Sequence, residues 1–305
     1  MHRKHGIRIF ALLALGACSV EGPGADPVRD GEDEAEPLAV EGDAVAVYAD
    51  SSRRFSAYCD PNYEGGWQKT LEGTWALCDR FVGDLEQTST RVGYWALAHM
   101  KSKFENACDH CSDSGVEHSD LIFHAGHGGA FSEADSRAVG ASGTTATLTM
   151  WNRNQRALTR NMRLGDEARG LSIFSTYSCY THSGSAASND PNPAGTEYTT
   201  RWGAAFRGGL RIATGTVADA IAGSAYKDVG KRFSDNLQAG KTIASAWLNA
   251  LTIGSDNDPS VIATGASSED CWFRLDNMTW NNFHDYRRFM DGEVRHFCRR
   301  YWTDV

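Results

Sequence analysis

Two short apolar segments near the middle of the chain constrain its fold more than any other feature. Residues 120–125 (DLIFHA) and 170–177 (GLSIFSTY) are apolar runs bounded by glycine or polar residues. This pattern is typical of strands that are covered on both faces, as in a parallel sheet. A third such strand is expected at 209–216, and apolar residues recur with helical spacing over 229–240 and 243–251. The alternation predicts an α/β fold with a mostly parallel sheet and helices on both faces.

Weaker patterns predict the remaining elements. Alternating residues favour a strand at 44–48, and apolar residues spaced by three or four favour helices over 67–85 and 194–207. Residues 92–104 fit a helix, although their aromatic residues also alternate as in a strand. The aromatic-rich tail, 270–305, is expected to dock on the domain.

The first 43 residues have the composition of a targeting segment followed by a linker. Residues 1–18 place basic residues before a short apolar run that ends in Leu-Gly-Ala-Cys18, which resembles the lipobox of bacterial lipoproteins. The resemblance implies a signal peptide and lipidation of Cys18, and Ser19 after it implies delivery to the outer membrane. Residues 19–43 hold nine acidic residues and one arginine, as an acidic disordered tether would. We therefore expect the folded domain to cover residues 44–305.

The charge balance limits the classes of partner. The formal net charge is −9, and no segment concentrates lysine and arginine as a phosphate-binding surface requires. Nucleic acid is therefore not an expected partner.

The cysteine count carries a second prediction. Lipidation of Cys18 would leave seven of the eight cysteines, and an odd number in an exported chain leaves at least one thiol unpaired. We expect Cys179 to be that thiol, and the other six to be largely oxidised, with the C-terminal segment linked by a disulfide: Cys59, Cys78, Cys108, Cys111, Cys271 and Cys298. Their connectivity does not follow from spacing, and Cys108-x-x-Cys111 fits a local disulfide, a redox pair or half of a metal site.

Each of the two clearest strands runs directly into a reactive residue. The first is followed by Gly126-His127-Gly128 and the second by Ser178-Cys179. Functional groups collect at the carboxyl ends of parallel strands, so His127 and Cys179 would lie side by side if the two strands are neighbours. A histidine beside a cysteine raises the thiolate population and then protonates a leaving group. The backbone N–H groups of Gly128 and Cys179 are candidate donors to an oxyanion.

These motifs resemble those of the clan CD cysteine peptidases, which include caspases, legumains and gingipains. The resemblance covers residues 119–253 and rests on Gly126-His127-Gly128 and on Ser178-Cys179 after a hydrophobic strand. It implies a caspase-like fold and a cysteine endopeptidase with a His127/Cys179 dyad and no cofactor. It also implies substrates that are peptides or proteins outside the cell membrane, recognised by one residue before the cleaved bond. Asp219 is the candidate for selecting a basic side chain there.

Other interpretations use the same or neighbouring residues. A metal site could draw its ligands from a group of six within twenty positions: Cys108, His110, Cys111, His118, His124 and His127. A surface module could bind glycans on an aromatic platform of Trp272, Trp280 and Trp302. A third alternative is a non-catalytic relative with the caspase-like fold.

Overall fold

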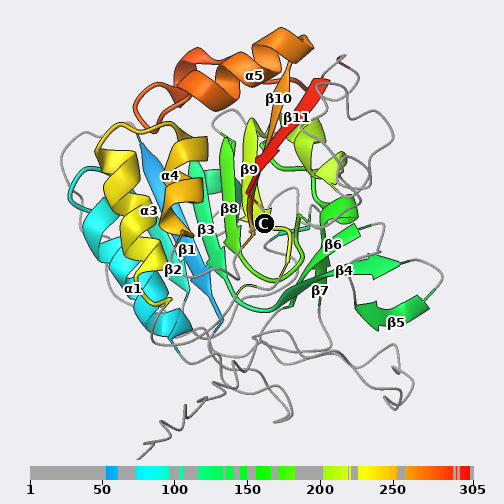
Figure 1. Ribbon diagram of the computed structural model, residues 1–305, viewed down its shortest axis with the longest axis horizontal. Helices are drawn as coiled ribbons and strands as arrows, with labels where there is room; N and C mark the ends of the chain where they lie inside the picture. The colour runs from blue at the N-terminus through cyan, green and yellow to red at the C-terminus, as the bar shows by residue number, and fades with distance from the viewer. Residues whose placement is uncertain are drawn as a thin grey trace, which may run out of the picture.

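The computed structural model describes most of the chain from residue 53 to residue 302 (Figure 1). The described residues are 53–60, 73–95, 104–105, 116–132, 135–139, 145–149, 156–165, 170–182, 202–218, 220, 226–252, 258–290, 293 and 296–302. The expected signal peptide, Cys18, the acidic tether and the strand at 44–48 lie outside this set. Among the described helices, none combines the length and the apolar composition that crossing a membrane requires.

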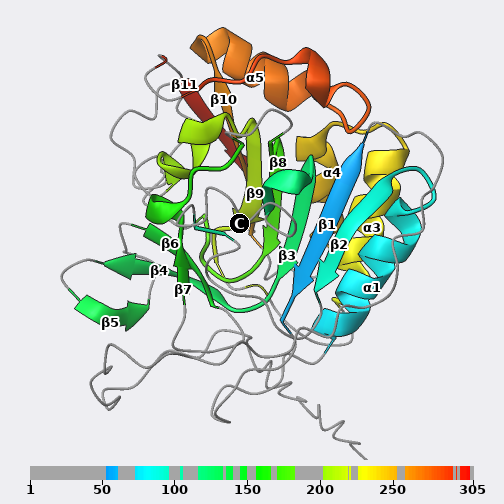
Figure 2. The ribbon, with the colours of Figure 1, turned by 180° about the vertical axis from the view of Figure 1, so that it is seen from behind.

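A seven-stranded mixed sheet forms the centre of the α/β fold (Figures 1 and 2). Its strand order is β11-β10-β9-β8-β3-β1-β2, with the bounds β1 Arg54–Cys59, β2 Thr90–Trp95, β3 Leu121–Ala125, β8 Ile173–Tyr177, β9 Ile212–Thr216, β10 Pro259–Gly265 and β11 His296–Tyr301. Strands β2, β1, β3, β8 and β9 pair in parallel, whereas β10 is antiparallel to both β9 and β11. The prediction of a mostly parallel sheet is therefore confirmed at the level of the α/β class.

The order of the strands along the chain creates a topological switch point, a position where the direction of strand addition reverses, between β1 and β3. From β1 the chain first adds β2 on one side, and it then adds β3, β8 and β9 in succession on the other side. At such a point, connections leave neighbouring strands in opposite directions, which opens a crevice at their carboxyl ends. Binding and catalytic groups in open α/β sheets are found there.

Helices α1 (Thr74–Leu85), α3 (Val229–Gln238) and α4 (Ile243–Ala250) cover one face of the large sheet (Figure 1). An aromatic cluster joins them to β3: the Phe81 and Phe123 rings stack with centroids 4.4 Å apart, and Phe233 and Trp247 pack edge to face at 5.1 Å. Helices α1 and α3 approach so closely that a Cβ on Gly230 would lie 2.0 Å from the carbonyl oxygen of Leu77. This face therefore holds the larger core.

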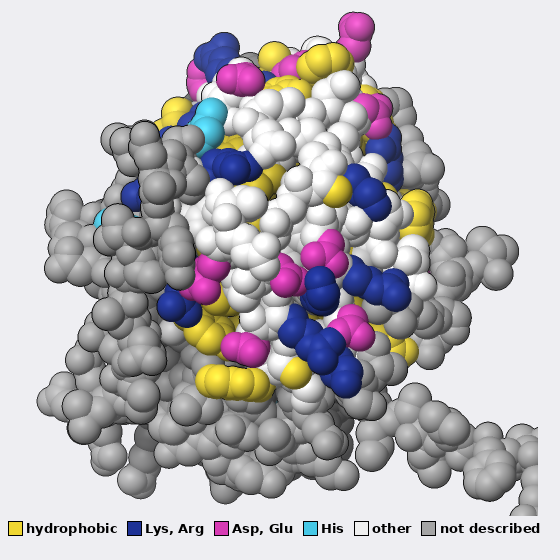
Figure 3. Space-filling model, turned by 90° about the vertical axis from the view of Figure 1, so that its left-hand side faces the viewer, with side chains coloured by type: hydrophobic (Ala, Val, Ile, Leu, Met, Phe, Trp, Pro, Cys, Tyr) yellow, Lys and Arg dark blue, Asp and Glu magenta, His cyan; other side chains and the backbone are white. Residues whose placement is uncertain are grey.

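The outer surface of these helices carries charges of both signs (Figure 3). Lys231 lies 3.1 Å from Asp84 and 3.0 Å from Asp235, and Arg80 pairs with Asp228. Exposed pairs of this kind are screened by solvent and contribute little to stability. The mixture fits a solvated outer face.

The other face has a different cover. A second core there includes Ile122, Phe174, Trp202 and Phe206. Some residues of this second core come from η4 (Ala205–Gly208), and others come from a four-stranded antiparallel sheet. The strand order of this small sheet is β5-β4-β6-β7, with the bounds β4 Gly128–Ser132, β5 Asp135–Val139, β6 Thr145–Thr149 and β7 Arg156–Leu158. In the described part of the chain, this face carries short turns and the small sheet, whereas helices were expected on both faces.

Two disulfides join helices to the large sheet. Cys59 at the end of β1 is bonded to Cys78 in α1, and Cys271 in α5 (Ser268–Asn277) is bonded to Cys298 in β11. Their sequence separations of 19 and 27 residues correspond to a stabilisation of roughly 3 kcal/mol each. The expected oxidation of these four cysteines and the disulfide-linked C-terminal segment are confirmed. Cys108 and Cys111 lie outside the described residues.

Several expected elements differ in type or extent. The helix expected over 92–104 is wrong at its start, because residues 90–95 form β2 parallel to β1. Within the helix expected over 194–207, the structure describes residues 202–207. Residue 202 is helical there, and the 3-10 turn η4 begins at Ala205. The tail docks as expected, with β11 adding the edge strand to the sheet.

Candidate functional site

His127 and Cys179 each follow one strand of a neighbouring parallel pair. Strands β3 and β8 pair in parallel with Ala125 opposite Tyr177, and each candidate residue follows its strand by two positions. The Gly126 backbone N–H donates to the Tyr177 carbonyl at 3.3 Å, which continues the pairing beyond the strands. The expectation that these strands are neighbours is confirmed. His127 follows β3, which borders the switch point, and Cys179 follows β8, the next strand in the sheet.

Gly128 fits closely against the turn that contains Cys179. A Cβ added to Gly128 would lie 2.7 Å from the Ser178 Cβ, 2.9 Å from the Cys179 carbonyl oxygen and 3.0 Å from Thr181 Cγ2. Contacts this short leave no room for any larger residue. The glycine after His127 is therefore required for the two segments to meet. Its role as an oxyanion donor stays a prediction.

The turn after β8 has an unusual backbone. Tyr180 has a φ of 54°, and it is the one residue other than glycine with a positive φ among those described. A left-handed conformation costs such a residue on the order of 1 kcal/mol. Strained residues of this kind cluster at functional sites, where the surrounding structure holds them in place.

A set of hydrogen bonds fixes this turn to the end of β9. The Thr216 hydroxyl donates to the Ser178 carbonyl at 2.7 Å, and the Tyr180 N–H donates to the Ala218 carbonyl at 2.9 Å. The His182 N–H donates to the Thr216 carbonyl at 2.8 Å, and the Trp202 indole N–H donates to the Thr181 carbonyl at 2.7 Å. None of these bonds involves the Cys179 side chain. They account for how the strained turn persists.

The sulfur of Cys179 is buried and oxidised. Cys179 is fully buried, and its Sγ accepts a hydrogen bond from the Ala220 backbone N–H at 3.3 Å. Cys179 is disulfide-bonded. The expectation that it is the unpaired thiol is therefore wrong. An odd number of cysteines in an exported chain implies at least one unpaired thiol, but the spacing of cysteines in the sequence does not show which of them come together in the fold.

Asp60 is a third polar residue at this edge, which the sequence analysis missed. It directly follows β1, its N–H donates to the Ala125 carbonyl at 2.9 Å, and its side chain is fully buried. Burial raises the pKa of the Asp60 carboxyl well above its ordinary value, because a low-dielectric environment disfavours the charged form. His127 is also buried, with 6 % of its surface exposed. An acidic residue immediately after an apolar strand was the available signal.

His124 belongs to a separate hydrogen-bonded group. Its Nδ1 lies 3.1 Å from the Thr176 hydroxyl and 3.1 Å from the Ser178 hydroxyl, and the Thr176 hydroxyl donates to that of Ser178 at 3.0 Å. The His124 ring also packs edge to face on Phe104, in the core opposite the helices. His124 therefore provides a hydrogen-bond partner for the Ser178 hydroxyl, at the start of the turn that contains Cys179.

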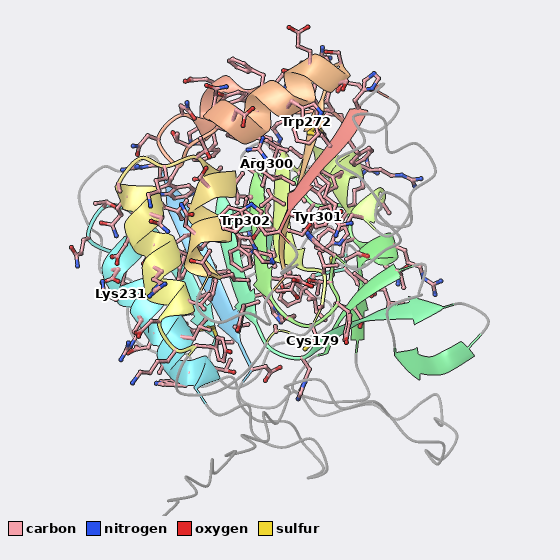
Figure 4. All side chains as sticks on the ribbon, in the orientation of Figure 1. Cys179, Lys231, Trp272, Arg300, Tyr301 and Trp302 are labelled. Carbon is pink, nitrogen blue, oxygen red and sulfur yellow. A yellow bond between two sulfur atoms is a disulfide. The ribbon has the colours of Figure 1, made fainter. Side chains whose placement is uncertain are left out.

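Two alternatives from the sequence were a metal site and an aromatic surface for glycans. No three of the described His, Cys, Asp and Glu side chains converge as metal ligands, and Cys108, His110 and Cys111 lie outside the described residues. Trp280 cannot join an exposed platform, because it is fully buried and stacked on Phe283. Trp272 and Trp302 lie along β11, apart from Cys179, as Figure 4 shows. Asp219, the candidate for substrate selection, is outside the described residues.

Comparison with known proteins adds a family and no activity. No curated protein matches the chain. A family model described as a domain of unknown function, DUF6345, matches residues 62–293. That range contains most of the described elements and every residue discussed at the carboxyl ends of β3 and β8. The chain belongs to the DUF6345 family.

Proposed function

We propose that this protein is a cysteine endopeptidase with a caspase-like fold and a His127/Cys179 dyad. The observation that carries the proposal is the parallel pairing of β3 with β8, in which Ala125 lies opposite Tyr177 and each candidate residue follows two positions later. The strand order gives further support to the histidine, because His127 follows β3, which borders the switch point where an open α/β sheet binds its ligands. The strained turn at Tyr180 is a third supporting feature.

The chemistry requires Cys179 in its thiol form, because the thiolate is the nucleophile. His127 takes the thiol proton, and the Cys179 sulfur adds to a peptide carbonyl to form a tetrahedral oxyanion. The N–H groups of Gly128 and Cys179 are the assigned donors to that oxyanion. His127 gives its proton to the departing amine as the C–N bond breaks. Water, deprotonated by His127, then hydrolyses the thioester and restores the thiol.

Asp60 has a position from which it can tune the dyad. It follows β1, which pairs directly with the strand that carries His127. A buried carboxyl group with a raised pKa, on the strand next to the one that a candidate base follows, is a feature that active sites often have. Asp60 is therefore assigned a positioning role in the proposed site.

The proposed setting is the outer surface of a bacterial membrane. The lipobox-like Leu-Gly-Ala-Cys18 supports a lipid anchor at Cys18, and the acidic residues that follow would form the tether. Substrates would then be peptides or proteins outside the cell membrane. Asp219 remains the proposed selector for a basic side chain before the cleaved bond.

The disulfide at Cys179 favours a second candidate function. A member of the family whose cysteine is permanently oxidised has no nucleophile, and it would act by binding alone. This candidate differs from the first in one measurable property, which is whether reduction of the folded protein produces peptidase activity.

A positional peptide library tests the proposal. The mature domain is assayed with and without reductant, together with Cys179→Ala and His127→Ala. His284→Ala, which removes an exposed histidine, serves as the control. We expect cleavage by the reduced wild type and by the control, and its loss in the other two variants. Cleavage that survives Cys179→Ala, or no cleavage by the reduced and folded wild type, would overturn the proposal.

A further inference from the structure

An exposed aromatic pair lies at the carboxyl end of the large sheet, outside the site described above. Trp75, in the first turn of α1, has 47 % of its surface exposed, and its ring centroid lies 5.9 Å from that of Tyr94, near the end of β2. The disulfide between Cys59 and Cys78 fixes this part of α1 to the end of β1. Tryptophan and tyrosine are enriched where proteins bind the apolar groups of a partner.

Tyr94 adds a polar group to this pair. Its hydroxyl is buried and has no hydrogen-bond partner among the residues that the structure describes. A tyrosine hydroxyl can donate one hydrogen bond and accept another, and a peptide backbone offers partners of both kinds. The Arg91 guanidinium lies 5.9 Å from the Tyr94 ring centroid, but its charge is paired with Glu86 at 2.6 Å. The pair is therefore suited to an uncharged, apolar side chain on a peptide backbone.

The aromatic pair and the proposed nucleophile border the same face of the sheet. Cys179 and Ala125, the last residue of β3, belong to the core beneath α1, α3 and α4, and Tyr94 packs against that core. Strands β8, β3, β1 and β2 are consecutive in the sheet and parallel, so their carboxyl ends lie at one edge. The switch point between β3 and β1 lies between Cys179 and the pair, and ligands of open α/β sheets bind there.

The strand spacing gives the length of peptide that would join the two places. Neighbouring strands lie about 4.8 Å apart, so the three intervals from β8 to β2 cover about 14 Å. An extended peptide advances about 3.4 Å per residue, and about four residues therefore cover this distance. A substrate attacked by Cys179 and laid across the strand ends would bring a side chain about four residues from the cleaved bond to Trp75.

We propose that Trp75 and Tyr94 form a subsite for a large apolar side chain of the substrate, about four residues from the cleaved bond. This inference rests on the proposed peptidase function. Trp75 contacts the side chain, and the Tyr94 hydroxyl forms a hydrogen bond with the peptide backbone beside it. Both residues determine specificity and take no part in breaking the bond.

The test uses a peptide library in which one position at a time holds phenylalanine or alanine. For the reduced wild type, phenylalanine about four residues from the cleaved bond should raise kcat/KM about tenfold, the low end of what an added apolar group contributes to discrimination. Trp75→Ala should lose this preference and should cleave the alanine peptides as the wild type does. Tyr94→Phe should keep the preference and raise KM for peptides that reach the subsite.

Phe273→Ala is the matched control for the loss of an exposed aromatic ring. Phe273 is 56 % exposed, and its ring centroid lies 6.4 Å from that of Tyr286. It belongs to α5, which the Cys271–Cys298 disulfide joins to β11 at the opposite edge of the sheet. The control should keep the preference for phenylalanine.

Binding is measured separately in Cys179→Ala, which has no nucleophile. Fluorescence anisotropy of labelled peptides should show binding about tenfold tighter with phenylalanine than with alanine at the same position. Adding Trp75→Ala should remove this difference, while circular dichroism shows that the protein remains folded.

The remaining outcomes separate failure of the subsite from failure of the peptidase function. Cleavage without a preference at this distance, a preference that survives Trp75→Ala, or one that Phe273→Ala also removes would overturn the subsite and leave the peptidase proposal standing. A reduced, folded wild type that cleaves nothing would overturn the peptidase proposal, and binding would then decide the subsite. Equal binding of the phenylalanine and alanine peptides would overturn the subsite as well.

Discussion

Gly128 lies so close to Cys179 that a Cβ on the glycine would sit 2.9 Å from the cysteine carbonyl oxygen. The two residues come from segments that follow different strands, so this contact fixes how the His127 segment meets the Cys179 turn. The contact leads directly to the first prediction.

Gly128→Ala should destabilise the protein by about 1–3 kcal/mol, since the added methyl group forces backbone shifts in a packed region. Gly83→Ala is the matched control, because nothing lies within 4 Å of a Cβ at this position in helix α1. The control should stabilise by about 0.4–1 kcal/mol. Urea unfolding of the oxidised proteins measures both effects, and equal midpoints for the two variants would contradict the prediction.

Thr216→Val should weaken the turn that holds Cys179. Its hydroxyl donates to the Ser178 carbonyl at 2.7 Å and lies 3.1 Å from the Ala218 carbonyl. Both carbonyls keep a second donor, the Thr181 hydroxyl and the Tyr180 N–H, so the variant should lose about 0.5–1.5 kcal/mol, the net contribution of a typical hydrogen bond.

Thr214, two residues earlier on β9, has a buried hydroxyl with no hydrogen-bond partner in the described structure. Thr214→Val should therefore be neutral or stabilising. Thermal unfolding compares the pair, and equal losses of stability would count against the role assigned to Thr216.

The pKa of Asp60 predicts how stability depends on pH. Because the folded-state pKa lies well above the ordinary value of 3.8, the folded protein holds this proton at pH values where the unfolded chain has released it. The contribution of Asp60 to stability is therefore greatest at low pH, and it falls as pH rises from about 4 through the folded-state pKa.

Asp60→Asn removes the ionisable carboxyl group, so the variant should have a larger free energy of unfolding than the wild type at pH 7. This difference in free energy should shrink towards pH 3. Free energies of unfolding from urea titrations at several pH values measure it. A difference that does not change with pH would show that the Asp60 carboxyl ionises normally. If Asp60 positions His127, the same variant should also shift the pH profile of peptide cleavage.

The sequence predicted the strands that carry the site better than it predicted their surroundings. Segments 120–125 and 170–177 could be recognised because strands buried on both faces are continuously apolar. Residues 92–104 were ambiguous, since the alternation of their aromatic residues fits a strand while their spacing also fits a helix. In the described part of this segment, the pairing of β2 with β1 decides for the strand. The small sheet β4–β7 gave no pattern that was recognised.

The redox state of Cys179 and the importance of Asp60 depend on contacts between distant segments. The oxidised state follows from which cysteines the fold brings together, and local spacing does not contain that information. Asp60 matters because β1 pairs with β3, although 65 residues separate Asp60 from its backbone partner Ala125. The pairing of β3 with β8, the strands that His127 and Cys179 follow, was predictable because it required a single assumption, that two buried strands are neighbours.

Ala220→Pro should slow alkylation of Cys179 in the reduced protein, because proline lacks the N–H that donates to Sγ and would stabilise the reactive thiolate. Ala220→Gly keeps this N–H and is the matched control. The rate of iodoacetamide alkylation at several pH values reports the reactivity of the thiol, and circular dichroism checks folding. Identical alkylation profiles for the two variants would show that the Ala220 N–H does not stabilise the thiolate.

The most direct test of the account is the cleavage rate of the reduced, folded protein compared with its Cys179→Ala and His127→Ala variants on one peptide library. The account predicts cleavage by the wild type, its loss to background in Cys179→Ala, and a fall of at least about 100-fold in His127→Ala, the usual minimum for a general acid or base. Cleavage by Cys179→Ala at the wild-type rate, or a reduced and folded wild type that cleaves nothing, would contradict it.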